Sequence, residues 1–355
     1  MARHRLKDVA ERAGVSVKTV SNVVNGYLHV RPDTRARVEE AIAELNYRPN
    51  LSARNLRKGR TGVIALAVPD FDLPYFAELA RHVVSEAAGH GWTVLIDQTG
   101  GKREQERLVA AGIRDHLIDG LIFSPLALTG ADLAGGGDGT PMVLLGERAD
   151  HGGADHVAID NVAAAREITA HLTGLGRRRV AAIGAQRTPQ GASARLRLRG
   201  YLAALAAAGI DRDDRLIAPA VQWHRADGAA AMRALLRSGV RPDAVFCFND
   251  TLALGALRTL HEEGLRVPED VAVAGFDDIE DGRFSVPTLS TVAPDKAEIA
   301  RLAVDLLAAR IDGARQPEAV PAGASVSPGG ARGPRGSRDL SAGYRLALRE
   351  STLGR

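Results

Sequence analysis

From about residue 61 to residue 290, short apolar runs alternate with longer stretches of helical periodicity, and this alternation restricts the fold more than any other feature. Strands are expected at 62–68, 93–96, 120–123, 142–145 and 157–159, and in a second series at 179–183, 216–218, 244–248 and 271–275. Helices are expected between them, among others at 75–88, 163–172, 197–208, 227–236 and 251–263. Such alternation is typical of parallel sheets with right-handed crossovers.

The two successive series predict an α/β body of two similar lobes. We expect lobe 1 to contain about 61–160 and 292–312, and lobe 2 about 161–291 and 344–350. Ligands of parallel sheets bind beyond the C-terminal ends of the strands, so a cleft between the lobes is the expected site. Residues 313–343 are rich in Gly, Pro, Ser and Arg, which predicts a disordered loop, and a short strand is expected after it at 344–348.

Residues 1–48 have a different pattern, with short helices expected over 6–13, from 17 to about 24, and from Pro32 onward. Gly14 can adopt the left-handed conformation that ends a helix, and Ser16 can cap the next one. This spacing predicts an all-α helix-turn-helix domain. The second helix of such a domain enters the major groove of DNA with its early residues against base edges.

The second predicted helix carries side chains suited to DNA. Val17 can pack on a thymine methyl group, Lys18 can donate to guanine, and Asn22 can pair with adenine. Short polar side chains nearby suit phosphate oxygens. The phosphate candidates are Ser16, Thr19, Ser21, Asn25, Thr34, Tyr47 and Asn50.

The charge distribution favours the same partner. The chain has a formal net charge of +3, but residues 1–60 contain 13 Lys/Arg and 6 Asp/Glu, so the rest of the chain is net acidic. A basic head on an acidic body is typical of a protein whose head binds a polyanion. Residues 49–60 have too few apolar side chains for a core, and we interpret them as a hinge that is helical only when supported.

Several motifs resemble the lactose-repressor (LacI/GalR) family. They are LKDVAERAGVS at 6–16, then Thr19-Val20-Ser21, Val24-Asn25, and AELNYRPN at 43–50. The resemblance continues to Asp295 and beyond. It implies a homodimer whose two heads read a palindromic operator, with Val17, Lys18 and Asn22 on bases. It also implies that Leu56 wedges into the minor groove, as apolar side chains do in proteins that kink DNA. Many members have arginine where this chain has Asn22.

The body of the family resembles periplasmic sugar-binding proteins. Arg197 matches the family's effector-binding arginine and Asp277 its effector-binding aspartate. Asn249 ends a strand, and Trp223 falls where members place an aromatic ring over the ligand. Tyr75 and Phe76 resemble the pair that lines the cleft in purine-responsive members. A polyhydroxyl ligand needs such a guanidinium fork, carboxylate acceptor, mixed amide and apolar plate. Asp250 is expected to cap the next helix.

One acid of the family pattern is missing, because Gly146 stands where several sugar-responsive members have aspartate. Glu147 is the nearest replacement. On a continuing strand, however, its side chain would point to the opposite face.

Other classes of protein fit less well. The chain lacks a P-loop, a Ser/His/Asp motif in a strand–turn–helix context, and metal-ligand spacing among its ten histidines, so we expect no enzyme, metal or cofactor. A single cysteine, Cys247, permits no internal disulfide, and we expect no signal peptide or membrane span, hence a cytoplasmic protein.

We therefore expect a repressor controlled by a sugar-like effector. A regulator that needs a purine or nucleoside as co-repressor, and a periplasmic-type small-molecule binding protein, are the alternatives. A leucine-heptad tail is also absent, which favours a dimer over a tetramer.

Overall fold

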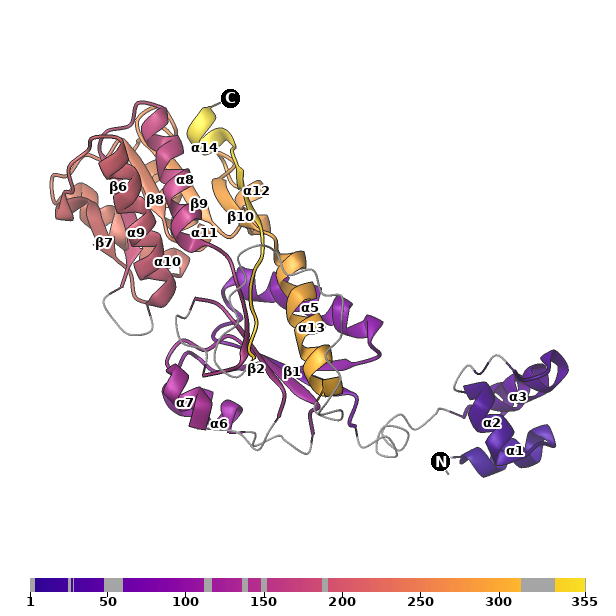
Figure 1. Ribbon diagram of the computed structural model, residues 1–355. Coiled ribbons are helices and arrows are strands. Elements are labelled where there is room, and N and C mark those ends of the chain that lie inside the picture. The colour runs from indigo at the N-terminus through magenta and orange to yellow at the C-terminus, as the bar shows by residue number, and fades with distance from the viewer. Residues whose placement is uncertain are drawn as a thin grey trace. The chain divides into compact units, whose positions relative to one another are not determined.

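The computed structural model describes residues 4–24, 27, 29–47, 60–111, 117–135, 140–147, 152–186, 191–313 and 336–354. It consists of two compact units, Met1–Gly62 and Val63–Arg355 (Figure 1). Each unit is considered on its own below. None of the helices in the described ranges is both long enough and apolar enough to cross a membrane.

The N-terminal unit contains helices α1 (Leu6–Ala13), α2 (Val17–Val24) and α3 (Pro32–Glu44). Val9, Val20 and Val38, one from each helix, are fully buried in a common core. Gly14 ends α1 with φ 63°, a left-handed conformation that costs glycine little. The Oγ of Ser16 accepts a hydrogen bond from the Thr19 amide at 3.1 Å, which caps α2. The predicted helix-turn-helix is confirmed.

The first sheet of the body has the strand order β11-β5-β4-β3-β1-β2, and all its strand pairs are parallel. Its strands are β1 (Val63–Val68), β2 (Thr93–Gln98), β3 (Gly120–Phe123), β4 (Met142–Leu145), β5 (Asp155–Ala158) and β11 (Asp339–Ser341). Helices α5 (Pro74–Gly89), α6 (Arg103–Ala110), α7 (Gly130–Gly135) and α13 (Lys296–Gly313) accompany it. Helix α13 lies against α5, as Figure 1 shows.

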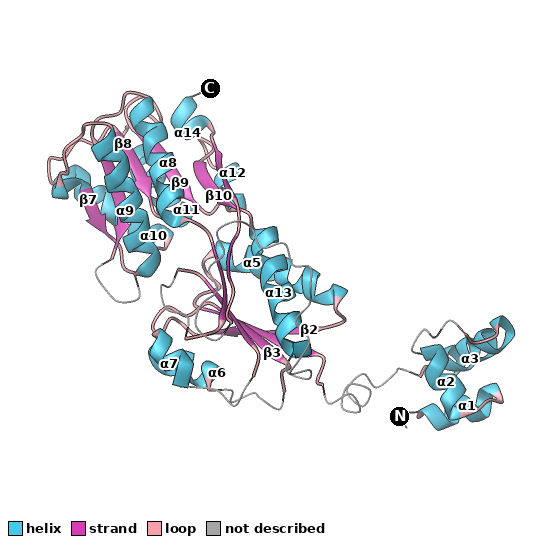
Figure 2. Cartoon of the chain, in the orientation of Figure 1, coloured by secondary structure: helices cyan, strands magenta, loops and turns pink. Residues whose placement is uncertain are grey.

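The second sheet has the order β12-β10-β9-β8-β6-β7 and is parallel except for the antiparallel β10–β12 pair. Figure 2 shows its strands in magenta among cyan helices. Its strands are β6 (Val180–Ala185), β7 (Ile217–Pro219), β8 (Ala244–Cys247), β9 (Ala272–Phe276), β10 (Ser290–Pro294) and β12 (Tyr344–Ala347). The predicted α/β body with two series of strands is confirmed.

Helices of the second lobe pack in close pairs. They are α8 (Asn161–Gly174), α9 (Ala192–Ala207), α10 (Arg225–Arg237), α11 (Asp250–Glu262), α12 (Glu280–Arg283) and α14 (Glu350–Leu353), with a 3₁₀ turn at Asp214–Leu216. A Cβ on Gly255 of α11 would overlap the carbonyl oxygen of Arg225 in α10. Glycine there allows the two helix backbones to touch.

Two expectations about the chain ends were wrong. Residues 292–294 were expected in the first lobe, but they belong to β10, which pairs with β9 and β12 in the second sheet. Part of the predicted disordered loop, Asp339–Ser341, is strand β11, which pairs with β5. The composition of 313–343 gives no sign of this three-residue strand, because the strand is defined by its pairing with β5, which lies far away in the sequence. Residues 314–335 lie outside the described residues.

Candidate functional site

The first candidate surface is the start of α2. Val17 is 45% exposed, Lys18 is exposed and Asn22 is half-buried, so all three have side-chain atoms at the surface. Ser16 and Thr19 are joined by a hydroxyl–hydroxyl hydrogen bond of 2.9 Å. Ser21 and Thr34 are half-buried.

The remaining predicted DNA contacts are either buried or outside the described residues. Tyr47 is only 8% exposed and packs into the core of the head, where burial raises its pKa. The structure therefore gives Tyr47 a packing role. Asn25, Asn50 and Leu56 lie outside the described residues, as does most of the predicted hinge.

The second candidate site is a cavity of about 580 Å³ in the body. Its walls include residues of α5 and of the loop after β4 in the first lobe, and residues of α9, β9 and the loop before α10 in the second. All six predicted effector residues line it: Tyr75, Phe76, Arg197, Trp223, Asn249 and Asp277. The parallel strands bring these residues together from positions 200 residues apart in the chain.

Arg197 lines this pocket and is held in place by a side-chain amide and a main-chain carbonyl. Its Nε donates to Asn161 Oδ1 at 2.7 Å, and its Nη1 donates to the carbonyl of Phe248. The guanidinium carbon lies 3.5 Å from the centroid of the Phe276 ring. Burial lowers its pKa, while nearby acids, Asp277 foremost, raise it. Arg197 is thus a rigid cation with one remaining edge near Asp277, whose Oδ1 is 3.8 Å from Nη2.

Asp277 follows β9 in a strained backbone conformation, with φ 115°. Such a conformation costs on the order of 1–3 kcal/mol and persists only where surrounding groups enforce it. Here the Asp277 amide donates to the carbonyl of Val292 at 2.8 Å, and Lys296 Nζ donates to the Asp277 carbonyl at 2.7 Å. Burial raises the pKa of Asp277 to about 6, although Arg197 and Lys296 lower it.

Lys296 also links the two lobes. Its Nζ lies 2.6 Å from Glu78 Oε2 on α5, and Glu78 Oε1 accepts from the amide of Glu280 at 2.9 Å. At another point of the pocket wall, His224 Nε2 of the second lobe lies 3.1 Å from Asp70 Oδ2 of the first. These polar bridges position the two sides of the pocket.

Asn249 lines the pocket and also serves the protein's own backbone. Its Oδ1 caps α11 by accepting from the Leu252 amide at 2.9 Å, and its Nδ2 donates to the carbonyl of Trp223 at 3.1 Å. Both ends of the amide are therefore engaged by protein. The expectation that Asp250 caps the helix was wrong, because Asp250 is the first residue inside α11 and accepts from the Ile279 amide and Thr291 Oγ1.

The aromatic residues form two walls. Trp223 has φ 65°, and its indole Nε1 donates to the Gly184 carbonyl at 2.9 Å. Tyr75 and Phe76 meet edge to face, with ring centroids 5.2 Å apart. Burial raises the pKa of Tyr75, and Asp277 and Glu147 add to this, so its hydroxyl stays protonated.

Two further residues line the pocket. Glu147, the nearest replacement for the acid missing at position 146, lines the cavity, whereas a continuing strand would have directed its side chain to the opposite face. The physical reason is that β4 ends at Leu145 and Gly146 has φ 93°, so strand alternation does not reach Glu147. Asn161, at the start of α8, also lines the cavity and holds Arg197.

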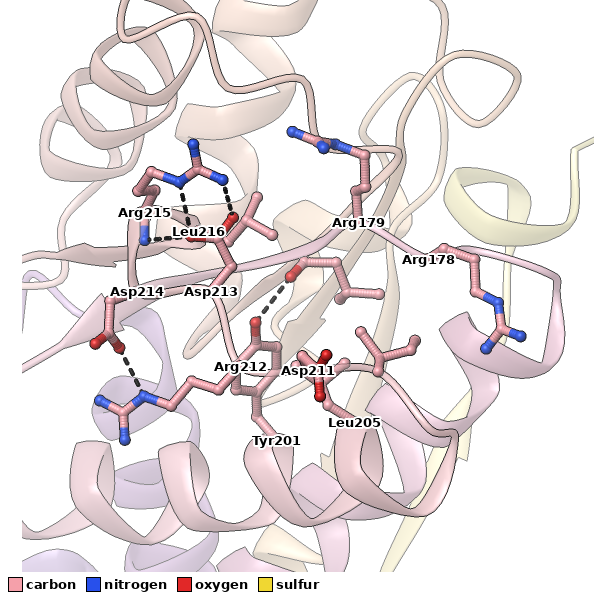
Figure 3. Close-up of a pocket in the computed structure, with 12 residues that line it drawn as sticks. Arg178, Arg179, Tyr201, Leu205, Asp211, Arg212, Asp213, Asp214, Arg215 and Leu216 are labelled. Carbon is pink, nitrogen blue, oxygen red and sulfur yellow. Dashed lines mark hydrogen bonds and ion pairs between the residues drawn. The ribbon is translucent and has the colours of Figure 1, made fainter.

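A second pocket, of about 490 Å³, lies between the start of β6 and residues 210–216 (Figure 3). Four of its charged side chains form two pairs, Arg215 with Asp213 at 2.7 Å and Arg212 with Asp214 at 2.6 Å. The hydroxyl of Tyr201 donates to the carbonyl of Val180 at 2.8 Å. Within the described ranges, no three His, Cys, Asp or Glu side chains gather as they would around a metal ion.

Comparison with known proteins finds a family model for each of the two parts of the chain. Residues 5–50 match the family model "Bacterial regulatory proteins, lacI family", and residues 169–331 match a "Periplasmic binding protein-like domain". The chain is 36% identical over 310 residues to the HTH-type transcriptional repressor CytR of Escherichia coli (strain K12), an alignment that covers 87% of this chain and 90% of CytR.

Solved structures extend this likeness over the whole chain. A complex of the transcriptional regulator CelR with cellobiose is 30% identical, with a TM-score of 0.69, and covers 98% of this chain and 100% of that one. The lac repressor dimer bound to operator and the anti-inducer ONPF is 28% identical, with a TM-score of 0.80, and covers 99% and 100%. The chain therefore belongs to the lacI family of bacterial regulatory proteins, the DNA-binding transcriptional repressors with a periplasmic-binding-protein-like effector domain.

Proposed function

We propose that this protein is a repressor that binds a palindromic operator as a homodimer. In this proposal a sugar-like effector changes the affinity of the dimer for the operator. The observation that carries the proposal is the pairing, in one chain, of a helix-turn-helix head with a pocket built on Arg197 and Asp277. The lac repressor, similar along nearly its whole length, is a dimer on its operator.

The head supplies the DNA contacts in this proposal. Val17, Lys18 and Asn22 read bases, while Ser16, Thr19, Ser21, Asn25, Thr34 and Asn50 contact phosphates, and Leu56 enters the minor groove. The exposure of Val17 and Lys18 on the first turn of α2 supports this assignment. A DNA partner is in keeping with a protein that works in the cytoplasm.

The pocket supplies the control. Arg197 and Asp277 offer a donor and an acceptor side by side, and Trp223 offers an apolar plate 5.4 Å from the guanidinium carbon. Hydroxyl-rich ligands use such combinations. The edge-to-face Tyr75–Phe76 pair favours a second candidate, a flat purine or nucleoside ligand that acts as a co-repressor. A ligand of either kind acts only by binding the operator-bound and free states with different affinity.

Electrophoretic mobility shift on the DNA upstream of the protein's own gene tests the proposal. Wild-type protein should form a complex at low salt, and Lys18→Ala should weaken it by roughly 1–3 kcal/mol and relax the choice of one base. Sedimentation should show a dimer. A thermal-shift screen of sugars and purines should find a ligand that changes operator affinity. A monomer that binds no DNA offered would refute the proposal and favour a small-molecule binding protein.

A further inference from the structure

The loop after β4 brings a carboxyl group into the effector pocket. Strand β4 ends at Leu145, and Gly146 adopts φ 93°, a left-handed conformation that L side chains rarely adopt. The turn is fixed to β5, because the Gly146 amide donates to the Val157 carbonyl at 3.3 Å and its own carbonyl contacts His156 Nε2. Glu147 consequently lines the same cavity as Arg197 and Asp277.

Asn161 places an amide donor in that cavity. The residue is 2% exposed, and its Oδ1 accepts from Arg197 Nε at 2.7 Å. Its Nδ2 faces the carboxyl of Glu147, and a side-chain hydrogen bond from Asn161 lowers the pKa of that carboxyl. Because an amide nitrogen carries two N–H groups, Nδ2 can serve Glu147 with one of them and a ligand acceptor with the other.

The charges around the pocket disfavour anions. The charged residues on its described walls are Asp70, Glu147, Asp277 and Arg197, with His224 beside Asp70. Two donors of Arg197 already serve protein acceptors. A phosphate or carboxylate entering the cavity would therefore face three acids and a cation with only one edge left, which lies beside Asp277.

We propose that Glu147 and the Nδ2 of Asn161 form an acceptor–donor pair that binds a hydroxyl group of the effector and rejects its anionic forms. A hydroxyl group can donate to the carboxylate and accept from the amide at once. In this arrangement the acid absent from position 146 is replaced from position 147 through the turn at Gly146. The inference rests on the proposed effector function of the pocket and adds the residues that select the ligand.

The acceptor role of Glu147 makes ligand binding depend on pH. Burial raises its pKa to about 7, whereas Arg197, the Ile159 amide and Asn161 lower it and Asp160 raises it, and Tyr75 faces it across the pocket. Only the ionised carboxylate accepts from a hydroxyl with both oxygens, so protons compete with the ligand. One such group with a pKa of about 7 makes binding about tenfold weaker at pH 6 than at pH 8. Asp277, with a pKa of about 6, adds to the loss of ligand affinity at the low end of this pH range.

The test uses the full-length protein and isothermal titration with neutral and phosphorylated probes. D-ribose and cellobiose represent free sugars, adenosine represents nucleosides, and ribose 5-phosphate and adenosine monophosphate are the anionic counterparts. We expect at least one neutral probe to bind, its phosphorylated counterpart to bind at least tenfold more weakly, and affinity to fall from pH 8 to pH 6. The sugar and nucleoside arms show which molecule carries the hydroxyl.

Two variants locate the effect. Glu147→Gln should weaken binding of the neutral probe about tenfold. It should also flatten the dependence of affinity on pH above pH 6.5, because an amide does not ionise in this range. Asn161→Asp keeps an acceptor for Arg197 but removes the amide donor, and it should also weaken binding about tenfold. Glu104→Gln, on the exposed face of α6, is the matched control and should bind like wild type.

Three results would overturn the inference: a phosphorylated probe that binds more tightly than its neutral form, no neutral probe binding at millimolar concentration, or an unaltered pH profile in Glu147→Gln. Each variant is checked by thermal unfolding, so that a folding defect is not taken for a binding defect. If wild-type protein still binds operator DNA in these cases, the proposed function stands and only the ligand-selecting pair fails. If it binds no operator, the proposed function itself fails.

Discussion

The Nδ2 of Asn249 donates a 3.1 Å hydrogen bond to the main-chain carbonyl of Trp223, while the Oδ1 of the same side chain caps helix α11. One amide thus fixes both the start of a helix and the loop that carries the aromatic plate of the pocket. Trp223 needs this support, because its φ of 65° is unfavourable for a bulky residue. The pocket therefore depends on Asn249 without requiring that Asn249 touch the ligand.

Asn249→Asp separates these two tasks. Aspartate caps helices as well as asparagine does, so the cap is kept, although a buried carboxylate beside Asp250 lowers the stability. The Trp223 carbonyl then keeps one of its two side-chain donors, Thr251 Oγ1, so the loop should loosen and the effector should bind several-fold more weakly. Asn249→Ala loses the cap as well and should cost about 1 kcal/mol more in stability. Denaturant titration and ligand titration measure the two effects, and wild-type affinity in Asn249→Asp would contradict this role.

Arg197→Lys is expected to lose effector binding while the head still binds DNA. Lysine keeps the charge but cannot donate to Asn161 Oδ1, Phe248 carbonyl and ligand from one planar fork. Losing a hydrogen bond to a charged group costs about 1.5–3 kcal/mol, which predicts a loss of affinity of roughly 10- to 100-fold. Mobility shift with and without effector measures it. Operator binding that no longer responds to effector is the expected result, and a normal response would count against the assignment.

Much of this pocket could be predicted from sequence, because the resemblance to the lactose-repressor family points to Arg197, Asp277 and Trp223, and all three line the cavity. The alternation of strands and helices independently predicted a site beyond the C-terminal strand ends. Glu147 could not be placed, because its direction depends on the positive φ of Gly146. Asn161 gave no signal of its own, since its importance lies in its contact with Arg197, 36 residues away. Strand β11 was missed for a similar reason, because only its pairing with β5 defines it.

Gly275→Ala should disrupt the support beneath Asp277. A Cβ at this position would overlap Asp250 Oδ1, the atom that accepts from Thr291 Oγ1 at 2.6 Å. Asp250 is fully buried and cannot move into solvent, so we expect a loss of about 2–4 kcal/mol in stability, together with weaker effector binding. Gly174→Ala, at the end of α8 with open space around its Cβ position, is the matched control. Its stability in urea should equal or slightly exceed that of wild type. Equal stability of the two variants would show that Asp250 and Thr291 can move to accommodate the added methyl group at little cost.

A buried carboxylate, Asp155, joins three elements of the first lobe. It is fully buried in β5, and Arg310 of α13 and Arg338, just before β11, both donate to it at 2.7–2.9 Å. Burial raises the pKa of this carboxyl, but the hydrogen bonds from Arg310 and Arg338 outweigh it, and the net pKa is lowered. The carboxylate is therefore stabilised in the folded state more than in the unfolded chain.

The lowered pKa fixes the sign of the pH dependence. The stabilisation is complete above the unfolded pKa of about 3.9 and is lost as the pH falls through the lower folded pKa. Asp155→Asn should cost about 2–3 kcal/mol at pH 7, less than for a fully buried pair because both arginines are partly exposed.

Comparison of variants in urea at several pH values tests this account. The deficit of Asp155→Asn relative to wild type should shrink below about pH 4, because wild type then loses the same charge. Asp305→Asn removes an exposed partner of Arg301 and is the control, with an expected change of less than about 1 kcal/mol. A deficit in Asp155→Asn that stays constant down to pH 3 would mean that its shape, and not its charge, holds β5, α13 and β11 together.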